Sequence, residues 1–256
     1  MEIKTRRPWG IRIEALTREE FLHTIISWAR EKNRPRLVTY QNAHCINLYF
    51  KDADYARIID QADLVYADGQ AVVWASRVLK ESLPERISAA DFFHEFCELC
   101  EKENLSLFFL GSGFGVAEKA AENLKQSCPQ LNISGARHGF FSLPEIPPLV
   151  SEIKEAKPDI LLVGMGAPRQ EQFAFRHFKE LRVPVVWCVG ALFEYVAGIT
   201  PRAPVWMRRL GLEWLFRLAL EPRRLWRRYL PGNVCFLWKV LLRSLKHTPP
   251  TPPPKK

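Results

Sequence analysis

Asp68 is the residue of this sequence whose type and setting best suit acid–base chemistry. It comes just after the short apolar run Leu64 to Tyr66 and directly before Gly69. This order predicts a carboxylate at the carboxyl end of a strand, beside a glycine that lets a ligand approach the backbone. A carboxylate held there could act as a general base, which contributes roughly 10²–10⁴ in rate. The alternative is that Asp68 caps the helix predicted to follow Gly69.

The stretch KPDILLVGMGAPRQE, from Lys157 to Glu171, contains a second group of candidate residues. Its apolar part, Ile160 to Val163, predicts a buried parallel strand, and Pro168 suits the first turn of a following helix. The residues around this joint would then lie where exposed helix amides attract anions. The candidates are Gly166, Gln170 and Glu171. An ordinary strand–turn–helix joint would show the same pattern.

Other polar and glycine residues follow predicted strands. Thr39 and Asn42 lie at the end of the strand predicted over Arg36 to Tyr40, where they could bond sugar hydroxyls. Arg86 lies in a predicted loop. Gly111 opens a glycine-rich turn that could approach a phosphate, although it lacks the dinucleotide fingerprint. No Asp-x-Asp or His-rich cluster offers an obvious divalent-metal site, and the sequence contains no nucleophile elbow. Together these features favour a transferase that acts on phosphorylated substrates, and we expect neither a metal nor another cofactor.

The elements that would position these residues alternate between strands and helices, which predicts an α/β fold. We expect a Rossmann-like, mostly parallel sheet flanked by helices over residues 1–200, with a C-terminal basic helical appendage. The predicted strands are Arg36–Tyr40, Leu64–Tyr66, Leu105–Leu110, Leu131–Ser134, Ile160–Val163 and Val183–Val189, with an edge strand within Ile11–Leu16. Thr17 and Glu20 predict a capping box for the first helix. Residues 144–148 are expected to form a loop.

Residues 201–246 form the predicted appendage, which we interpret as several short amphipathic helices separated at proline and glycine residues. From Arg202 to Lys256 the sequence has 13 Lys and Arg against 2 Asp and Glu, and the whole chain has a net charge of +9. Arg224, Arg227 and Arg228 are spaced to share a helix face. Such a basic, aromatic segment suits an anionic membrane surface, although nucleic acid or packing on the core would also fit. The proline-rich tail, residues 247–256, is expected to be disordered.

The cellular compartment is also constrained by the sequence. No apolar stretch reaches the ~18 residues of a transmembrane helix, and the N-terminus lacks the apolar core of a signal peptide. The six cysteines lie among apolar neighbours, and we interpret them as reduced, buried thiols. We therefore expect a cytoplasmic protein.

Three blocks of this sequence are similar to the WecG/TagA/CpsF family of bacterial glycosyltransferases, glycosyltransferase family 26. The resemblance extends from about Val38 to Leu242. The blocks are YADGQAVVWASR, VGMGAPRQE and VGALFEYVAGITPRAPVWMRRLGLEWLFRLALEPRRLWRRY.

The resemblance implies an inverting, metal-independent enzyme of bacterial cell-surface polysaccharide or teichoic acid synthesis. It would transfer a sugar, typically an N-acetylhexosamine such as ManNAc, from a UDP-sugar to a sugar on undecaprenyl diphosphate. Such an enzyme would act as a peripheral protein on the inner face of the cell membrane. A homo-oligomer is compatible with the sequence, and we expect no nucleic-acid partner.

The resemblance also implies roles for individual residues. Asp68 matches the general base that deprotonates the acceptor hydroxyl, and Thr39 matches a residue that contacts substrate. Gln170 matches a glutamine near the nucleotide. The arginines of the appendage match residues that close over the active site and would neutralise diphosphate; they are Arg217, Arg224 and Arg227, to which we add Arg202. The identity of the sugar stays open.

Three alternatives remain at this point. The first is a nucleic-acid-binding α/β protein that uses the basic appendage, which would show a steep salt dependence. The second is a nicotinamide-dependent oxidoreductase, which the missing fingerprint disfavours. The third is a non-catalytic member of the family.

Overall fold

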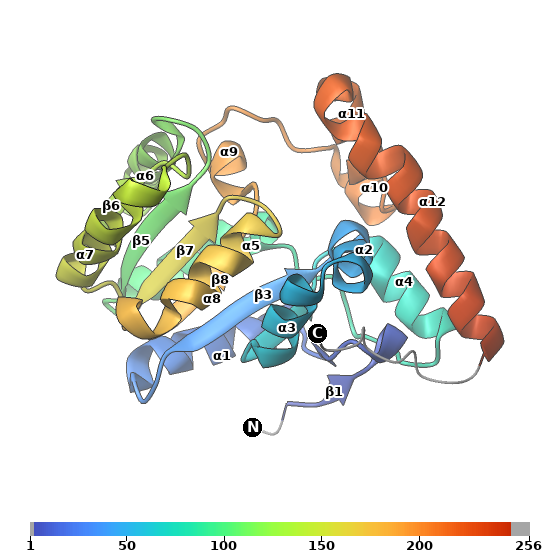
Figure 1. Ribbon diagram of the computed structural model, residues 1–256. Coiled ribbons are helices and arrows are strands. Elements are labelled where there is room, and N and C mark those ends of the chain that lie inside the picture. Colours follow the sequence, from blue (N-terminus) through green and yellow to red (C-terminus); the bar gives the residue numbers. More distant parts are fainter. Residues whose placement is uncertain (1–2, 247–256) are drawn as a thin grey trace.

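A six-stranded parallel sheet forms the centre of the molecule in the computed structural model, which describes residues 3–246 (Figure 1). The strand order is β4-β3-β8-β7-β5-β6. The strands are β3 (Arg36–Gln41), β4 (Leu64–Ala67), β5 (Ser106–Gly111), β6 (Asn132–Arg137), β7 (Ile160–Gly164) and β8 (Val185–Cys188). The α/β fold expected from the sequence is confirmed.

Helices cover both faces of this sheet. One layer contains α2 (Ala43–Lys51), α3 (Ala53–Gln61), α7 (Ile146–Ala156) and α8 (Arg169–Leu181). The other contains α1 (Arg18–Glu31), α5 (Ala89–Lys102), α6 (Val116–Ser127) and α9 (Leu192–Val196). The short helix α4 (Gln70–Val78) follows β4. With a helix layer on each side, the central strands are buried on both faces, which explains their continuous apolar sequence.

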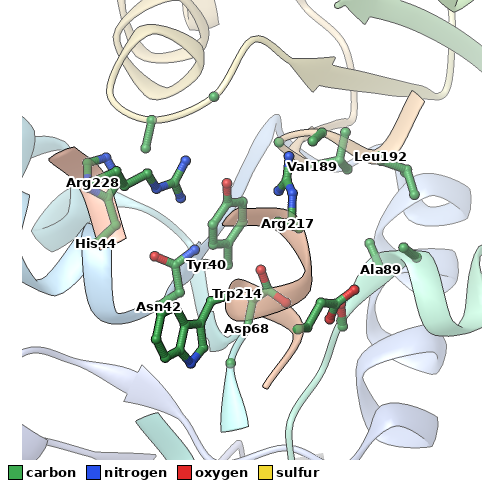
Figure 2. A pocket seen from close by; sticks show the side chains of 18 of the residues that line it. Tyr40, Asn42, His44, Asp68, Ala89, Val189, Leu192, Trp214, Arg217 and Arg228 are labelled. Atoms are coloured by element: carbon green, nitrogen blue, oxygen red, sulfur yellow. The ribbon is translucent and has the colours of Figure 1, made fainter. Parts of the chain in front are cut away.

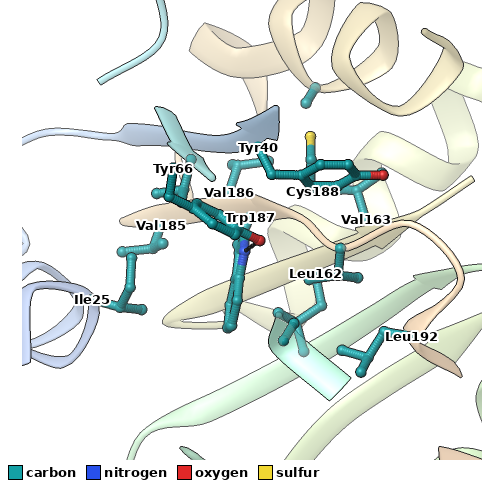
Figure 3. Close-up of a cluster of buried hydrophobic side chains, with 14 of the residues drawn as sticks. Ile25, Tyr40, Tyr66, Leu162, Val163, Val185, Val186, Trp187, Cys188 and Leu192 are labelled. Carbon is teal, nitrogen blue, oxygen red and sulfur yellow. Dashed lines mark hydrogen bonds between the residues drawn. The ribbon is translucent and has the colours of Figure 1, made fainter. Parts of the chain in front are cut away.

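Aromatic side chains fill much of the core beneath β3, β4 and β8. The indole of Trp187 donates a hydrogen bond to the hydroxyl of Tyr66 at 3.0 Å, and both side chains are buried (Figure 3). The ring of Phe21, from α1, packs against both of them. This cluster ties α1 to β4 and β8, and Asp68 directly follows β4.

Three local predictions had different outcomes: the capping box is confirmed, the edge strand is short and lies outside the main sheet, and the loop over residues 144–148 is wrong. The capping box of α1 is present, because the Thr17 hydroxyl accepts from the amide of Glu20 at 3.2 Å and the Glu20 carboxylate accepts from the amide of Thr17 at 2.8 Å. The predicted edge strand is a two-residue strand, β2 (Ile13–Glu14), which pairs with β1 (Thr5–Arg6) outside the main sheet. Residues 144–148 are not a loop: a 3-10 helix spans Leu143–Glu145, and α7 begins at Ile146 with its prolines in the first turn, where no amide hydrogen is needed.

The C-terminal segment contains α10 (Val205–Arg209), α11 (Glu213–Leu220) and α12 (Pro222–Lys246). The predicted break at Pro231 is wrong, since α12 continues through it for 25 residues. Contacts with the domain offset the hydrogen bond that the proline removes: Asn47 of α2 donates to the carbonyl of Gly232 at 2.7 Å, and Phe236 is buried against Trp9 of the N-terminal segment. Within residues 3–246 no helix is long and apolar enough to cross a membrane.

The predicted tail, residues 247–256, lies outside the described residues. Five of the six cysteines are buried as expected, but Cys235 on α12 is exposed.

Candidate functional site

A cavity of about 690 Å³ lies at the carboxyl edge of the sheet. Residues that follow each of the six parallel strands line it, and α11 and α12 supply its remaining wall. Open α/β sheets bind their ligands at this edge. Its charged residues are six arginines and three carboxylates: Arg86, Arg169, Arg202, Arg217, Arg224, Arg228, Asp68, Glu194 and Glu213. The excess of cations favours an anionic ligand.

Asp68 lies in this cavity directly after β4 (Figure 2). Its backbone amide donates to the carbonyl of Gln41 at 2.9 Å, which ties the end of β4 to β3. The capping alternative is wrong, because Gly69 is the N-cap residue of α4. Burial raises the pKa of Asp68 to about 6, although the nearby Arg86 guanidinium lowers it in part. A carboxyl group with a pKa near neutrality is suited to accept a proton from a substrate.

Arg86 and Arg202 line the cavity, but carboxylates already engage both guanidinium groups. Arg86 contacts Glu213 at 3.2 Å and also pairs with Asp91. Arg202 contacts Asp91 at 2.6 Å and Glu213 at 3.0 Å, and Arg208 joins the same group. This network therefore attaches α10 and α11 to the carboxyl edge of the sheet.

The arginines of α11 and α12 differ in their contacts. Arg217 stacks on the ring of Tyr195 and lies 3.9 Å from Glu194, whereas Arg224 pairs with Glu221 at 2.8 Å.

Arg228 has no carboxylate within 4.0 Å among residues 3–246, and its Nε is buried without a hydrogen-bond partner there. It lines the cavity, whereas the predicted Arg227 lies exposed over the ring of Trp226 and does not. The helical phase explains the difference, since Arg228 lies three residues after Leu225, which is buried.

Thr39, Gln170 and Glu171 are fully buried beneath the cavity and do not line it. Successive residues of a strand face opposite sides, so Tyr40 reaches the cavity while Thr39 points away. Thr39 donates to Glu171 at 3.1 Å, and Gln170 donates to the same carboxylate oxygen at 2.7 Å. The other oxygen of Glu171 has no partner among the described residues, and burial raises the pKa of Glu171 to about 7.

Of the remaining predicted residues, two line the cavity and one, Gly111, supports the sheet instead. Asn42 and Gly166 line the cavity, and Asn42 also caps α2 by accepting from the amide of Cys45 at 3.1 Å. Gly111 does not line it. A Cβ at Gly111 would lie 2.3 Å from the carbonyl oxygen of Gly164, so this glycine lets β5 and β7 approach closely.

Sequence reasoning missed several residues of the cavity wall: Tyr40, His44, Trp214 and Arg228. Burial and, to a smaller extent, the nearby Arg228 guanidinium lower the pKa of His44 to about 4, so this imidazole is neutral at physiological pH. Residues 3–246 contain no group of three or more His, Cys, Asp or Glu that could hold a metal ion.

A buried carboxyl group and a set of arginines at the carboxyl edge of a parallel sheet suit an α/β transferase that acts on anionic substrates. This chain belongs to the WecG/TagA/CpsF family of glycosyl transferases, whose model matches residues 6–250.

Among its relatives are the N-acetylglucosaminyldiphosphoundecaprenol N-acetyl-beta-D-mannosaminyltransferases of two Staphylococcus aureus strains, COL and MRSA252. They are 33% and 32% identical to this chain over 214 residues, which cover 83% of this chain and 82% of each relative. The family and the glycosyltransferase activity expected from the sequence are confirmed.

Proposed function

We propose that this enzyme transfers N-acetylmannosamine from its UDP-activated form to N-acetylglucosamine on undecaprenyl diphosphate. The names of its relatives support this choice of sugar and acceptor. The observation in the structure that supports it best is Asp68, a carboxyl group with a pKa of about 6 in a cavity lined by six arginines. Both substrates contain a diphosphate, for which guanidinium groups are the preferred partners.

The reaction that this arrangement supports is a single displacement with inversion. The Asp68 carboxylate accepts the proton of the acceptor hydroxyl while the hydroxyl oxygen forms a bond to the anomeric carbon. The bond from that carbon to the phosphate oxygen breaks, and its electron pair leaves with UDP. The arginines of the cavity stabilise the charge that develops on the departing diphosphate.

Transfer from a panel of UDP-sugars to a short-chain polyprenyl-diphosphate-GlcNAc, with EDTA present, tests this proposal. UDP-N-acetylmannosamine should be the preferred substrate, and Asp68→Asn should lower kcat at least about 100-fold. Activity that survives the substitution would remove Asp68 from the base role. Activity that EDTA abolishes would refute a metal-independent reaction, and preference for another UDP-sugar would refute the assigned specificity.

The proposed site of action is the inner face of the cell membrane, which α12 would contact. Exposed apolar side chains recur along its outward face at intervals of three or four residues. They are Trp226, Leu230, Val234, Leu237, Leu241 and Leu245, which we name the outer stripe. The opposite face, which includes Leu225 and Phe236, packs on the domain. Arg223 and Arg227 are exposed near the amino end of the outer stripe.

An apolar stripe flanked by arginines is typical of helices that lie in the interface of an anionic bilayer. Binding to nucleic-acid phosphates uses cations and would leave the leucine and valine side chains of this stripe exposed to water. The outer stripe therefore favours the membrane, and it gives Arg227 a role at lipid headgroups rather than at substrate.

Co-sedimentation with vesicles that contain phosphatidylglycerol tests this contact. Leu237→Glu should weaken binding, whereas Leu143→Glu should not, because Leu143 is even more exposed but lies outside the appendage. Equal binding of both variants would refute the contact. Light scattering in parallel would show whether the stripe instead joins two copies of the chain, in which case Leu237→Glu would yield a smaller particle.

A further inference from the structure

Tyr40 is a residue of the cavity wall for which neither the sequence motifs nor the reaction above supplies a role. It is the penultimate residue of β3, and its side chain is only 6% exposed. Its hydroxyl accepts a hydrogen bond from Nε2 of Gln170 at 3.3 Å. Within residues 3–246 this is the only hydrogen bond that the hydroxyl makes.

The orientation of the Gln170 amide is fixed by its other partners. Its Oε1 accepts from the backbone amide of Gly166 at 3.2 Å and from that of Gly190 at 3.0 Å. Since two N–H groups face this oxygen, the nitrogen must face the other way, where it donates to Tyr40 and to Glu171. All four hydrogen-bonding positions of this buried amide are therefore used. Gln170 thereby links β3 to the turns that follow β7 and β8.

This arrangement dictates where the proton of Tyr40 points. Because the hydroxyl oxygen accepts from Gln170, its own O–H bond is directed away from Gln170. The oxygen also fits closely against the turn after β8, since a Cβ at Gly190 would lie 2.6 Å from it. Burial raises the pKa of Tyr40 well above its ordinary value, and the nearby Glu171 and Asp68 raise it further. The hydroxyl thus stays protonated and is free to donate into the cavity.

Figure 2 shows the Tyr40 hydroxyl between the side chains of Arg228 and Arg217, on the side of the ring away from Asp68. Of the two α12 arginines that line the cavity, Arg224 pairs with Glu221, whereas the guanidinium of Arg228 has no carboxylate partner among the described residues. An anion drawn to these two cations would lie within reach of the hydroxyl.

We propose that Tyr40 donates a hydrogen bond to the diphosphate of the departing nucleotide, and that Gln170 is the positioning residue that directs this hydroxyl. The assignment rests on the proposed function, because it needs a nucleoside diphosphate as leaving group. Negative charge grows on the phosphate oxygen as its bond to the anomeric carbon breaks. A fixed neutral donor stabilises that charge more in the transition state than in the bound substrate, and the Tyr40 proton is not transferred.

Tyr40→Phe removes this donor and leaves the ring in place. It should lower kcat about 100-fold, in the range seen when one oxyanion donor is lost, while KM for the UDP-sugar changes less than about threefold. Tyr55→Phe is the matched control, because Tyr55 is also buried and its hydroxyl also accepts from an amide, at 3.4 Å from Gln41, yet it does not line the cavity. The control should retain wild-type kcat. A Tyr40→Phe enzyme with wild-type kcat would overturn the proposal.

Gln170 is tested through its coupling to Tyr40. Gln170→Glu keeps an acceptor for the amides of Gly166 and Gly190 but removes the Nε2 donor. If Gln170 acts through Tyr40, this substitution should cost much less activity in the Tyr40→Phe background than in the wild type. Equal costs in both backgrounds would show a separate structural role and overturn the positioning assignment.

A crystal structure of the unaltered enzyme with UDP tests the contact without any substitution. The Tyr40 hydroxyl should lie within about 3.2 Å of a phosphate oxygen, and a diphosphate bound beyond its reach would overturn the proposal. Transfer by the wild-type enzyme, and its loss in Asp68→Asn, report on the proposed function separately. A transferase with an unaffected Tyr40→Phe variant would contradict the role of Tyr40 alone.

Discussion

Glu171 offers the sharpest test of the electrostatics beneath the cavity. It is fully buried, and one of its carboxylate oxygens has no partner among residues 3–246. Burial raises its pKa from 4.5 to about 7, which the hydrogen bonds from Gln170 and Thr39 only partly offset. Glu171→Gln removes the ionisable group and keeps an acceptor oxygen for both of these donors.

The sign of the effect follows from proton linkage. Because the folded pKa lies above the unfolded pKa, the folded state binds more protons between pH 4.5 and 7, and stability is lost as pH rises through this window. The reference is low pH, where Glu171 is protonated in both the folded and the unfolded state. For a shift from 4.5 to about 7, the free energy of unfolding is lower than this reference by about 3 kcal/mol at pH 8 but by only about 1 kcal/mol at pH 5. Because glutamine does not ionise, the Glu171→Gln protein does not lose this stability as the pH rises. Its stability relative to the wild type should therefore increase by about 2 kcal/mol from pH 5 to pH 8.

Urea unfolding of both proteins at pH 5 and pH 8 measures this difference. The substitution also changes packing, but that contribution is shared by the two pH values and cancels in the comparison. Glu122→Gln is the control, because it makes the same chemical change at an exposed position of α6, where burial makes no contribution. A relative stability of Glu171→Gln that is the same at both pH values, or lower at pH 8, would refute the reasoning.

Three further predictions follow from other parts of the structure. Asp68 must be ionised to accept a proton, and its pKa is raised to about 6. Therefore kcat/KM should rise with pH up to about 6 and fall about tenfold per pH unit below it. A profile that is flat from pH 5 to 8 would contradict the role of Asp68. Gly111→Ala should lower the free energy of unfolding by at least about 2 kcal/mol, because its Cβ would overlap the carbonyl of Gly164. Gly115→Ala should lower it less, since φ is also positive there but no atom lies within 4 Å of the added Cβ. Equal losses of stability in thermal melts of the two variants would refute this. Glu213→Gln weakens the ion pairs with Arg86 and Arg202 and should speed tryptic cleavage within residues 198–204, whereas Glu221→Gln, on the same appendage, should not.

The sheet could be predicted from the sequence because its central strands, such as β5 and β7, are continuous apolar runs bounded by glycine. The position of Asp68 at a strand end followed from the same pattern. The sequence pattern did not show whether Thr39 or Tyr40 would line the cavity, because this depends on which face of β3 meets the cavity. That orientation is set by the pairing of β3 with β4 and β8, and these contacts are distant in sequence.

The appendage shows a second limit of local patterns. Pro231 predicts a break in α12, because proline removes a helical hydrogen bond and crowds the preceding turn. The helix persists because tertiary contacts with α2, such as the bond from Asn47 to the Gly232 carbonyl, hold both of its halves. The continuity of α12 in turn fixes the rotational phase that places Arg228 in the cavity and Arg227 outside it.

The continuity of α12 also connects the two proposed roles of the appendage. Arg228 at the cavity and Leu237 in the outer stripe belong to one helix, separated by nine residues and therefore by about 13 Å along its axis. A lipid-linked acceptor needs its diphosphate near the bilayer surface and its sugar near Asp68. If α12 lies on the bilayer with its outer stripe and lines the cavity with Arg228, it would place the acceptor's diphosphate at the bilayer surface and its sugar near Asp68 at the same time. Membrane binding and substrate binding should therefore strengthen each other, and the vesicles used for co-sedimentation should lower KM for a long-chain acceptor more in the wild type than in Leu237→Glu. Equal KM values in the two enzymes would mean that α12 performs these roles independently.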